Sequence, residues 1–550
     1  MKTFLVSLLA ASIPVRALHR SPGIEVGPID AGTEKLSKRS LSFNGWGTFD
    51  QLIDHSNPHL GTFPQRYWYG TEFWKGPGSP IILMTPGEVP ATNLNKTYTT
   101  ADRLPGLFAS ETGGAVIILE HRYWGESSPF TSLTSKNLQY LTTENARKDL
   151  AYFANNFKPP FDESGASSPA LAPWILSGGS YAGALAAWTA ALDPGTFWAY
   201  HVTSGVVQAV EDYWRYFSAA QEAMPQNCSA DFHKVIAHVD QVLLKGRGED
   251  KLRLKEKFLL TDLSDADFAY ALSSGPRMWQ STQFYTSTLL KSSPFYDFCD
   301  HVENVELNSG PVPGAEGIGL PRALNGYAKW FTEQYLPGFC ESTDYPSYRG
   351  RNNTRCFALT DPTNPVYHDL SAANNGADRQ WQWMLCNEPF EYWQTAPPPS
   401  YPTLVSRLLT ADYFRAQCAL FFPSSPATGI SQGQRAADVN NRTGGWTFPP
   451  AQPPRRIMFT NGERDPWLGA TVSAAGRPGG PMRGTEDAPV RVIPGGTHCS
   501  DLYRQNWAGN EGVRRVVEEE VRDLKRWVGE FYGERRRRRR GLGWRGQRWF

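Results

Sequence analysis

The residue with the clearest capacity for chemistry is Ser180, which stands in the sequence Ser177-Gly178-Gly179-Ser180-Tyr181-Ala182-Gly183. A short apolar run precedes it and small residues follow, which favours a sharp turn from a strand into a helix. Such a nucleophile elbow presents a serine hydroxyl above the edge of a sheet. The motif departs from Gly-x-Ser-x-Gly, because alanine stands two places after the serine. On this motif alone, the Gly-rich turn of a nucleotide-binding fold remains an alternative.

A nucleophilic serine needs a histidine base and a carboxylate that orients the histidine. Asp465 and His498 each follow an apolar run and a turn that contains glycine. The chain order Ser180, Asp465, His498 is that of α/β-hydrolases. Glu463 is the alternative acid, but Pro466-Trp467 fixes the loop directly after Asp465. The sequence therefore predicts acyl transfer through these three side chains.

The remaining site residues are predicted from their neighbourhood. The backbone N–H of Tyr181 and a second N–H near Gly87 are the expected oxyanion donors, although Pro86-Gly87 also suits a plain turn. His121, between Glu120 and Arg122, is expected to belong to a buried ion-pair element. Three further histidines follow no Gly-rich strand end and are expected to be structural: His201, His233 and His238.

The elements that would position these residues alternate between strands and helices. Two arms of a hairpin are expected at 49–55 and 62–69, apolar strands at 80–84, 115–119, 174–179, 200–207, 456–460 and 489–493, and helices at 143–157 and 512–527. Buried apolar strands that alternate with helices predict a mostly parallel sheet covered on both faces.

Between the nucleophile and the acid, residues 208–445 lose this rhythm. They contain helix-like stretches such as 230–244 and 412–421, and six of the seven cysteines. We predict a large, mostly helical, disulfide-bridged cap above the carboxyl edge of the sheet, where ligands bind in open α/β sheets. Six cysteines allow fifteen pairings. We expect Cys228–Cys299, Cys340–Cys356 and Cys386–Cys418, with Cys499 free or differently paired.

The chain begins with a lysine, an apolar run and Val15-Arg16-Ala17, which predicts a signal peptide over 1–17. Glycans are expected at four sequons: Asn95, Asn227, Asn352 and Asn441. We therefore expect a secreted, lysosomal or vacuolar protein in an oxidising compartment. Residues 18–44 would be a flexible or pro-segment, 45–207 and 446–530 the two parts of the α/β-hydrolase domain, and 531–550 a disordered basic tail.

The composition excludes several classes of function. With 55 Lys and Arg against 54 Asp and Glu, the chain is not a polyelectrolyte binder, so no nucleic-acid partner is expected. No segment after the signal peptide is long enough for a membrane anchor. No Cys-x-x-Cys or His-rich cluster suggests a metal, and no cofactor is expected. None of these features argues against a homodimer.

Four motifs in order carry a resemblance to a known family. They are Gln51-x-x-Asp54-His55 with Thr62-Phe63-x-Gln65-Arg66-Tyr67, Glu120-His121-Arg122-Tyr123-x-Gly125-Glu126-Ser127, the elbow, and Asp465-Pro466-Trp467. Together they resemble the lysosomal Pro-X carboxypeptidase and dipeptidyl peptidase II family, which includes fungal secreted prolyl endopeptidases of acid optimum. The match runs from about residue 45 to 530.

The resemblance implies a serine peptidase that cuts after proline in acid, with Trp467 in the pocket for the proline ring. It implies peptide substrates. An acid optimum would oppose a histidine base, which must be neutral to act, unless the pKa of His498 is lowered or protonation of other groups raises the rate. The alternatives are a broad-specificity serine carboxypeptidase, a non-catalytic binding protein on a hydrolase scaffold, and a lipase or esterase. An intact set of three catalytic residues argues against the binding protein, and a polar cap argues against the lipase.

Overall fold

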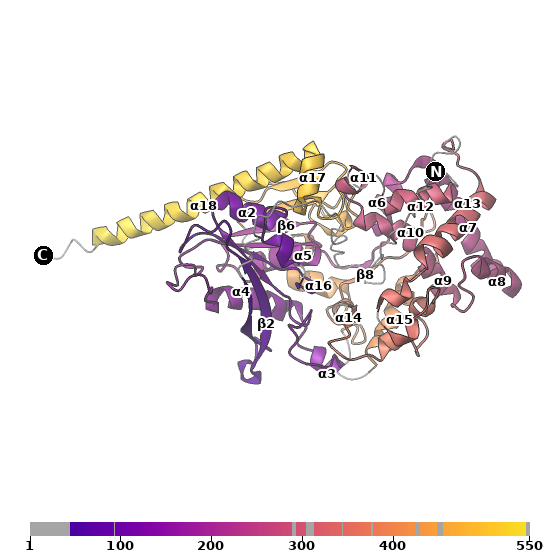
Figure 1. Ribbon diagram of the computed structural model, residues 1–550, viewed down its shortest axis with the longest axis horizontal. Coiled ribbons are helices and arrows are strands. Elements are labelled where there is room, and N and C mark those ends of the chain that lie inside the picture. Colours follow the sequence, from indigo (N-terminus) through magenta and orange to yellow (C-terminus); the bar gives the residue numbers. More distant parts are fainter. Residues whose placement is uncertain are drawn as a thin grey trace, which may run out of the picture.

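The computed structural model in Figure 1 describes residues 45–545, apart from 93, 289–292, 304–312, 344, 376–377, 424–428 and 448–454. The predicted signal peptide 1–17 and the segment 18–44 lie outside the described residues. Within the described residues, no helix is long and apolar enough to cross a membrane.

The central sheet contains strands from both the first and the last part of the described chain. Its strands are β1 Gly45–Leu52, β2 Thr62–Gly70, β3 Ile81–Met84, β4 Ala115–Leu119, β5 Trp174–Gly179, β6 Ala199–Thr203, β9 Ile457–Gly462 and β10 Val490–Ile493. Their order is β1-β2-β4-β3-β5-β6-β9-β10. Strand β2 runs antiparallel to both neighbours, and the other described pairs are parallel. The predicted hairpin and mostly parallel sheet are confirmed.

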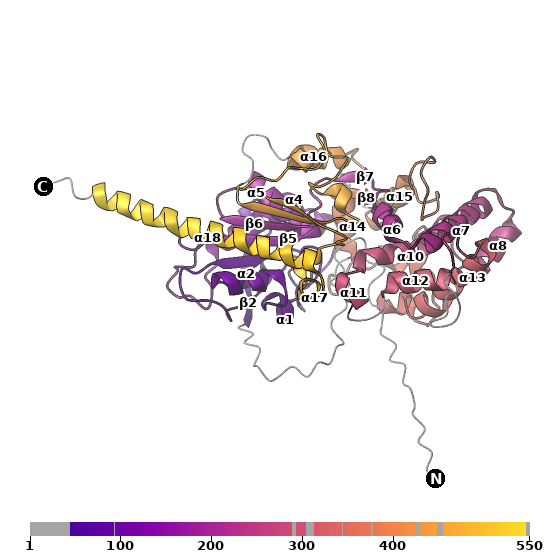
Figure 2. The same ribbon diagram turned by 90° about the horizontal axis from the view of Figure 1, so that it is seen from above.

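Helices cover both faces of this sheet because its strands are apolar on both sides. In β3, Ile82 and Met84 pack into the cluster beneath α2 (Leu104–Thr112) and α18 (Glu511–Arg545). Ile81 and Leu83 face the cluster beneath α4 (Thr143–Asn156) and α5 (Ser180–Leu192). Successive side chains of a strand point to opposite faces, so an unbroken apolar run fills two layers. The layered arrangement is visible in Figure 2.

The insertion between β6 and β9 forms the predicted cap. Its helices include α6 Tyr216–Ala223, α7 Gln226–Lys245, α8 Gly248–Lys257, α9 Asp265–Leu272, α10 Ser274–Arg277, α11 Phe284–Thr288, α12 Pro294–Val302, α13 Leu320–Trp330, α14 Asp378–Asn387, α15 Ala411–Phe421 and α16 Ala436–Thr443. A short parallel pair, β7 Val210–Asp212 and β8 Glu391–Trp393, belongs to the same insertion. Both views place α7, α8, α12 and α13 in a separate lobe, with α14 and β8 between that lobe and the sheet (Figures 1 and 2).

Three disulfides hold the cap together. They join Cys228 to Cys299, Cys340 to Cys356, and Cys386 to Cys418, which is the pairing predicted from the sequence. Cys499 is a buried free thiol. Each bridge closes a loop within the insertion, so the cross-links stabilise the cap itself rather than its attachment to the sheet.

The described part of the basic tail predicted at 531–550 belongs to the last helix. Helix α18 continues to Arg545 and projects beyond the body of the molecule (Figure 1). Its first tail turn still packs, because the Phe531 ring lies 5.1 Å from that of Trp198, and the Tyr532 hydroxyl donates to the Gly78 carbonyl at 2.8 Å. Glutamate and arginine are good helix formers, so a docked helix can propagate through this run.

Candidate active site

Ser180 lies at the sharp turn between β5 and α5. Its φ is +56°, a left-handed conformation that is costly for a residue with a side chain and typical of a nucleophile elbow. The helix packs closely on the strands: a Cβ added at Gly178 would lie 2.2 Å from the Ala182 carbonyl oxygen, and one at Gly183 would lie 3.0 Å from the Thr203 carbonyl oxygen. These two glycines therefore allow the turn that lifts Ser180 out of the sheet.

The loop after β3 accommodates the alanine that departs from the common motif. Gly87 has a φ of +71°, and a Cβ added there would lie 3.1 Å from the Ala182 Cβ and 3.3 Å from the Ala182 nitrogen. Glycine at 87 thus leaves space for the methyl group at 182. The Tyr181 N–H is in the first turn of α5, where backbone donors have no partner within the helix. The two predicted oxyanion residues consequently lie side by side.

Asp465 and His498 meet at the ends of the neighbouring strands β9 and β10. His498 Nδ1 lies 3.0 Å from Asp465 Oδ1 and 3.1 Å from Oδ2, and both side chains are buried. Asp465 also accepts the Trp467 N–H at 2.8 Å. Glu463, the alternative acid, is exposed and accepts the Gly495 N–H at 2.7 Å instead. The acid in contact with the histidine is therefore Asp465.

The histidine loop packs against the elbow. A Cβ added at Gly179, the residue before Ser180, would lie 3.1 Å from Cys499 Sγ. The Cys499 N–H donates to the Ser204 hydroxyl at 2.9 Å, and the His498 carbonyl accepts from Gln283 Nε2 at 2.8 Å. Among the described residues, the buried His498 Nε2 has no hydrogen-bond partner. This nitrogen is the one that a serine nucleophile must reach.

The ionisation of His498 depends on two opposing effects. Burial lowers the pKa of His498, but the Asp465 carboxylate raises it, and the net direction is well above the ordinary value. The lowered pKa that an acid optimum would require is therefore not what this environment favours.

Trp467 lies on the loop after Asp465, in a buried aromatic group. Its ring stacks on Tyr213 at 5.1 Å and meets the edges of Tyr216 and Tyr392, each at 5.4 Å. Its indole N–H donates to Gln280 Oε1 at 3.0 Å. The side chain is 2% exposed, so little of the ring is open in this conformation. The aromatic neighbours come from the cap, and sequence reasoning did not find them.

His121 is not an ion-pair element, contrary to the prediction. Its Nε2 lies 3.1 Å from the Tyr181 hydroxyl and its Nδ1 lies 2.8 Å from the Arg122 carbonyl oxygen. Burial lowers the pKa of His121 to about 4, so the ring is neutral at physiological pH. The ion pairs are made by its neighbours, as Glu120 bonds Arg66 at 2.8 Å and Arg122 bonds Asp149. The motifs at 51–67 and 120–127 thus form one buried polar cluster behind the elbow.

A second buried network of polar side chains lies on the α18 side of the sheet. No sequence pattern predicted it. His201 Nδ1 lies 2.9 Å from the Ser177 hydroxyl, and its Nε2 lies 3.2 Å from Asp501 Oδ2 and 3.9 Å from Glu520 Oε1. His201, Asp501 and Glu520 present possible metal-ligand atoms within 4.8 Å of one another. However, Thr203 and Thr460 hydroxyls already donate to the two carboxylates. His201 is structural, as expected, and the network links β5 to the segment directly after His498.

The predicted glycan sites differ in access. Asn352 and Asn441 are exposed and Asn227 is half-buried. Asn95 is 9% exposed at the start of a short helix, which argues against a glycan at that residue because the side-chain amide must be reached.

The sheet order, the serine elbow after β5 and the histidine and carboxylate after β10 and β9 define an α/β-hydrolase with an inserted helical cap. The family model of serine carboxypeptidase S28 matches residues 51–309 and 341–517. The chain therefore belongs to the serine carboxypeptidase S28 family, and it is a serine-type peptidase.

The chain is similar to several curated proteins over most of its length. A protein named serine protease vicPa, from Bipolaris victoriae, is 43% identical over 91% of this chain and 92% of its own. A probable extracellular serine carboxypeptidase from Arthroderma benhamiae is 31% identical over 85% of this chain and 64% of its own. The human thymus-specific serine protease is 24% identical over 92% of this chain and 89% of its own. These names agree with a peptidase whose substrates are peptides.

Proposed function

We propose that this protein is a secreted serine peptidase that hydrolyses the peptide bond after proline, with Ser180, His498 and Asp465 as its catalytic triad. The observation that carries the proposal is the buried Asp465–His498 pair: within the described residues the second ring nitrogen of His498 has no hydrogen-bond partner, and the next residue, Cys499, packs against the elbow. A serine, a base and an orienting carboxylate in these roles perform acyl transfer.

The reaction would proceed through an acyl-enzyme. Ser180 Oγ attacks the proline carbonyl carbon while His498 Nε2 takes its proton, and Asp465 stabilises the resulting imidazolium. The Tyr181 N–H and a donor of the Gly87 loop stabilise the oxyanion. His498 then returns the proton to the leaving amine. Water then attacks the acyl carbon while His498 Nε2 takes one of its protons. The bond to Ser180 Oγ breaks as His498 gives that proton to the serine oxygen, which frees the product acid.

Selection of proline would rest on the aromatic group around Trp467. A proline ring is a compact apolar body without an N–H, so an aromatic surface can bind it without leaving a donor unpaired. Trp467 follows the proposed catalytic aspartate by two residues and its N–H donates to the Asp465 carboxylate, so the ring belongs to the same loop as the acid. Since it is almost fully buried, binding needs a small displacement of the flanking cap residues.

The decisive experiment uses peptides with proline at the second position, at an internal position and next to the C-terminus, with Ser180→Ala as the matched variant. Cleavage after proline that disappears in Ser180→Ala is expected. Activity that survives in this variant would contradict the mechanism, and cleavage indifferent to proline would contradict the specificity. The pattern across the three positions also separates exopeptidase from endopeptidase action.

The same assay across pH 4 to 8 tests the acid optimum that the family resemblance implies. Because Asp465 raises the pKa of His498, the neutral base is lost as pH falls through that pKa, and kcat/KM should fall with it. A rate that rises toward pH 4 would instead show that substrate binding, or protonation of other groups, outweighs the ionisation of His498.

A further inference from the structure

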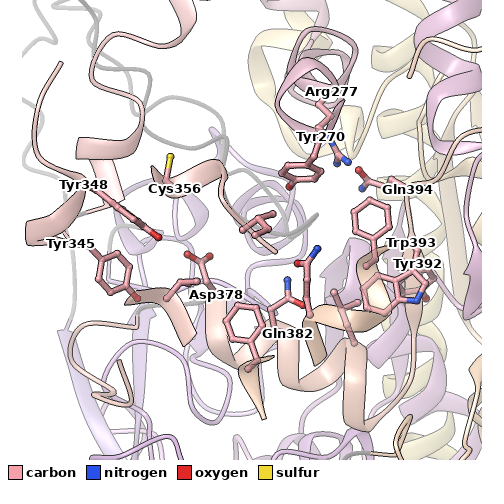
Figure 3. Close-up of a pocket in the computed structure, with 16 residues that line it drawn as sticks. Tyr270, Arg277, Tyr345, Tyr348, Cys356, Asp378, Gln382, Tyr392, Trp393 and Gln394 are labelled. Carbon is pink, nitrogen blue, oxygen red and sulfur yellow. The ribbon is translucent and has the colours of Figure 1, made fainter. Parts of the chain in front are cut away.

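A cavity of about 90 Å³ lies inside the cap, and none of Ser180, Asp465 and His498 lines it. Figure 3 shows its walls, with Tyr345, Tyr348 and Asp378 on one side and Arg277, Gln394, Trp393 and Tyr392 on the other. About 10–15 Å³ of such volume holds one water, so the cavity has room for an entire amino-acid side chain.

The cavity lies directly next to the aromatic group proposed to bind proline. Tyr392 lines the cavity, and its ring is 5.4 Å from that of Trp467. Arg277 also lines the cavity, and its guanidinium lies 5.9 Å from the ring of Tyr216, the other edge neighbour of Trp467. Two independent contacts thus connect the cavity to the surroundings of Trp467.

One wall of the cavity carries a buried side-chain amide. Gln394 is 2% exposed, and within the described residues neither its Oε1 nor its Nε2 has a hydrogen-bond partner. The buried Trp393 Nε1 likewise has none. Buried polar groups are rarely left unpaired, and a side-chain amide offers one acceptor and two donors. A peptide unit, with one N–H and one C=O, would complement Gln394.

Most of the other lining residues are apolar or aromatic, beside the polar Arg277 and Asp378. Phe414, Phe421 and Leu385 are buried, whereas Tyr345 and Val366 are half-buried. The adjoining residues Glu391 and Tyr392 both have positive φ, at 61° and 47°. Consecutive strained residues without glycine are concentrated at ligand-binding sites, because only a demanding local geometry maintains them.

The position of His498 indicates which part of a peptide would reach the cavity. His498 must protonate the leaving amine, so residues after the cleaved bond lie on its side, near Gln283 and Cys499. Neither of those residues lines the cavity. The cavity therefore suits the residues that precede the proline better than those that follow the cleaved bond.

We infer that this cavity is a substrate subsite for a large apolar side chain at one of the two positions before the cleaved proline, with Gln394 bonding the peptide main chain. The inference rests on the proposed function, and it makes the enzyme selective for apolar residues upstream of proline. Arg277 and Asp378 would border the subsite rather than bind the side chain itself.

The test measures kcat/KM for blocked peptides that carry Gly, Leu or Phe at each of the two positions before proline, and for a substrate truncated at the proline. The wild-type enzyme should prefer Phe or Leu over Gly at one position by about tenfold or more. Gln394→Leu, which keeps size but removes hydrogen bonding, should lower kcat/KM about fivefold more on the long peptides than on the truncated substrate. Its Tm should not fall, because an unpaired buried amide is removed.

Gln139→Leu, at the exposed glutamine that directly follows helix α3 (Ser135–Leu138), is the matched control and should keep the wild-type preferences. Val366→Trp, at a half-buried residue that lines the cavity, fills part of its volume and should reduce the preference for Phe over Gly, which provides a second test if Gln394→Leu misfolds. Cleavage after proline without any upstream preference would overturn this inference alone. Absence of cleavage after proline would instead overturn the proposed function.

Discussion

At the scale of single residues, the site depends on which of two neighbouring carboxylates reaches the histidine. Asp465 lies within 3.1 Å of His498 Nδ1 through both oxygens, whereas Glu463 caps the next loop at the Gly495 N–H. The two acids are two residues apart in the sequence, and only one of them is buried.

This difference predicts opposite results for two amide substitutions. Asp465→Asn should lower kcat by about 10⁴-fold, because the asparagine favours the wrong tautomer and no longer stabilises the imidazolium. Glu463→Gln removes the same charge nearby and should change kcat less than about threefold. Steady-state kinetics on one proline substrate, with Tm as a check of folding, would measure both. Equal losses in the two variants would contradict the assignment of Asp465.

At the scale of elements, helix α18 is fixed to the sheet by a buried acid. Glu520 accepts from the Thr460 hydroxyl, and its Oε1 lies 3.9 Å from His201 Nε2. Burial, together with the charge of Asp501, raises the pKa of Glu520 well above its ordinary value. The folded protein therefore keeps a proton on Glu520 at a pH where the unfolded chain has lost it.

Linkage gives the sign of the pH effect. A raised carboxyl pKa in the folded state means that stability falls as pH rises from about 4.5 through the raised pKa. Glu520→Gln removes this contribution, so its Tm should exceed that of the wild type at pH 8, and the difference should shrink toward pH 5. Glu530→Gln, which loses a half-exposed ion pair with Arg526 on the same helix and does not contribute to the pKa of Glu520, is the control and should keep the wild-type pH dependence. A constant Tm difference at all pH values for Glu520→Gln would contradict a protonated Glu520.

At the scale of the whole molecule, the cap is cross-linked internally while the hydrolase part carries no described disulfide. The rings of Trp381 and Phe390 nevertheless pack 5.5 and 5.8 Å from that of Tyr181 in the elbow. Loss of cap structure should therefore affect the active site as well as the cap.

The disulfide bridges should contribute unequally to the free energy of unfolding, because a longer closed loop restricts the unfolded chain more. Cys228–Cys299 spans 71 residues and Cys340–Cys356 spans 16. The entropy lost by the unfolded chain stabilises the folded protein by about 4.4 kcal/mol for the first bridge and about 3 kcal/mol for the second. Replacing both cysteines of the first pair by serine should lower Tm more than the same change in the second, as calorimetry of the two double variants would show. The reverse order would mean that native contacts, rather than loop closure, decide their contribution.

The elements that local chemistry specifies could be predicted from the sequence. Short unbroken apolar runs that alternate with helical segments indicated strands buried on both faces, and glycines at 178 and 183 indicated a close strand-to-helix turn with Ser180 at its corner. The chain order of Ser180, Asp465 and His498 followed from the ends of three such runs. These patterns are local, so they can be recognised without knowing what each element packs against.

Contacts between distant segments depend on the folded arrangement of the chain and could not be predicted. Folding placed His121 on Tyr181, joined His201 to Asp501 and Glu520 across about 300 residues, and surrounded Trp467 with Tyr213, Tyr216 and Tyr392 of the cap. It also continued α18 through a run of arginines that composition alone suggested to be disordered. Side-chain burial, pairing and pKa depend on neighbours brought together by folding, and no local pattern encodes them.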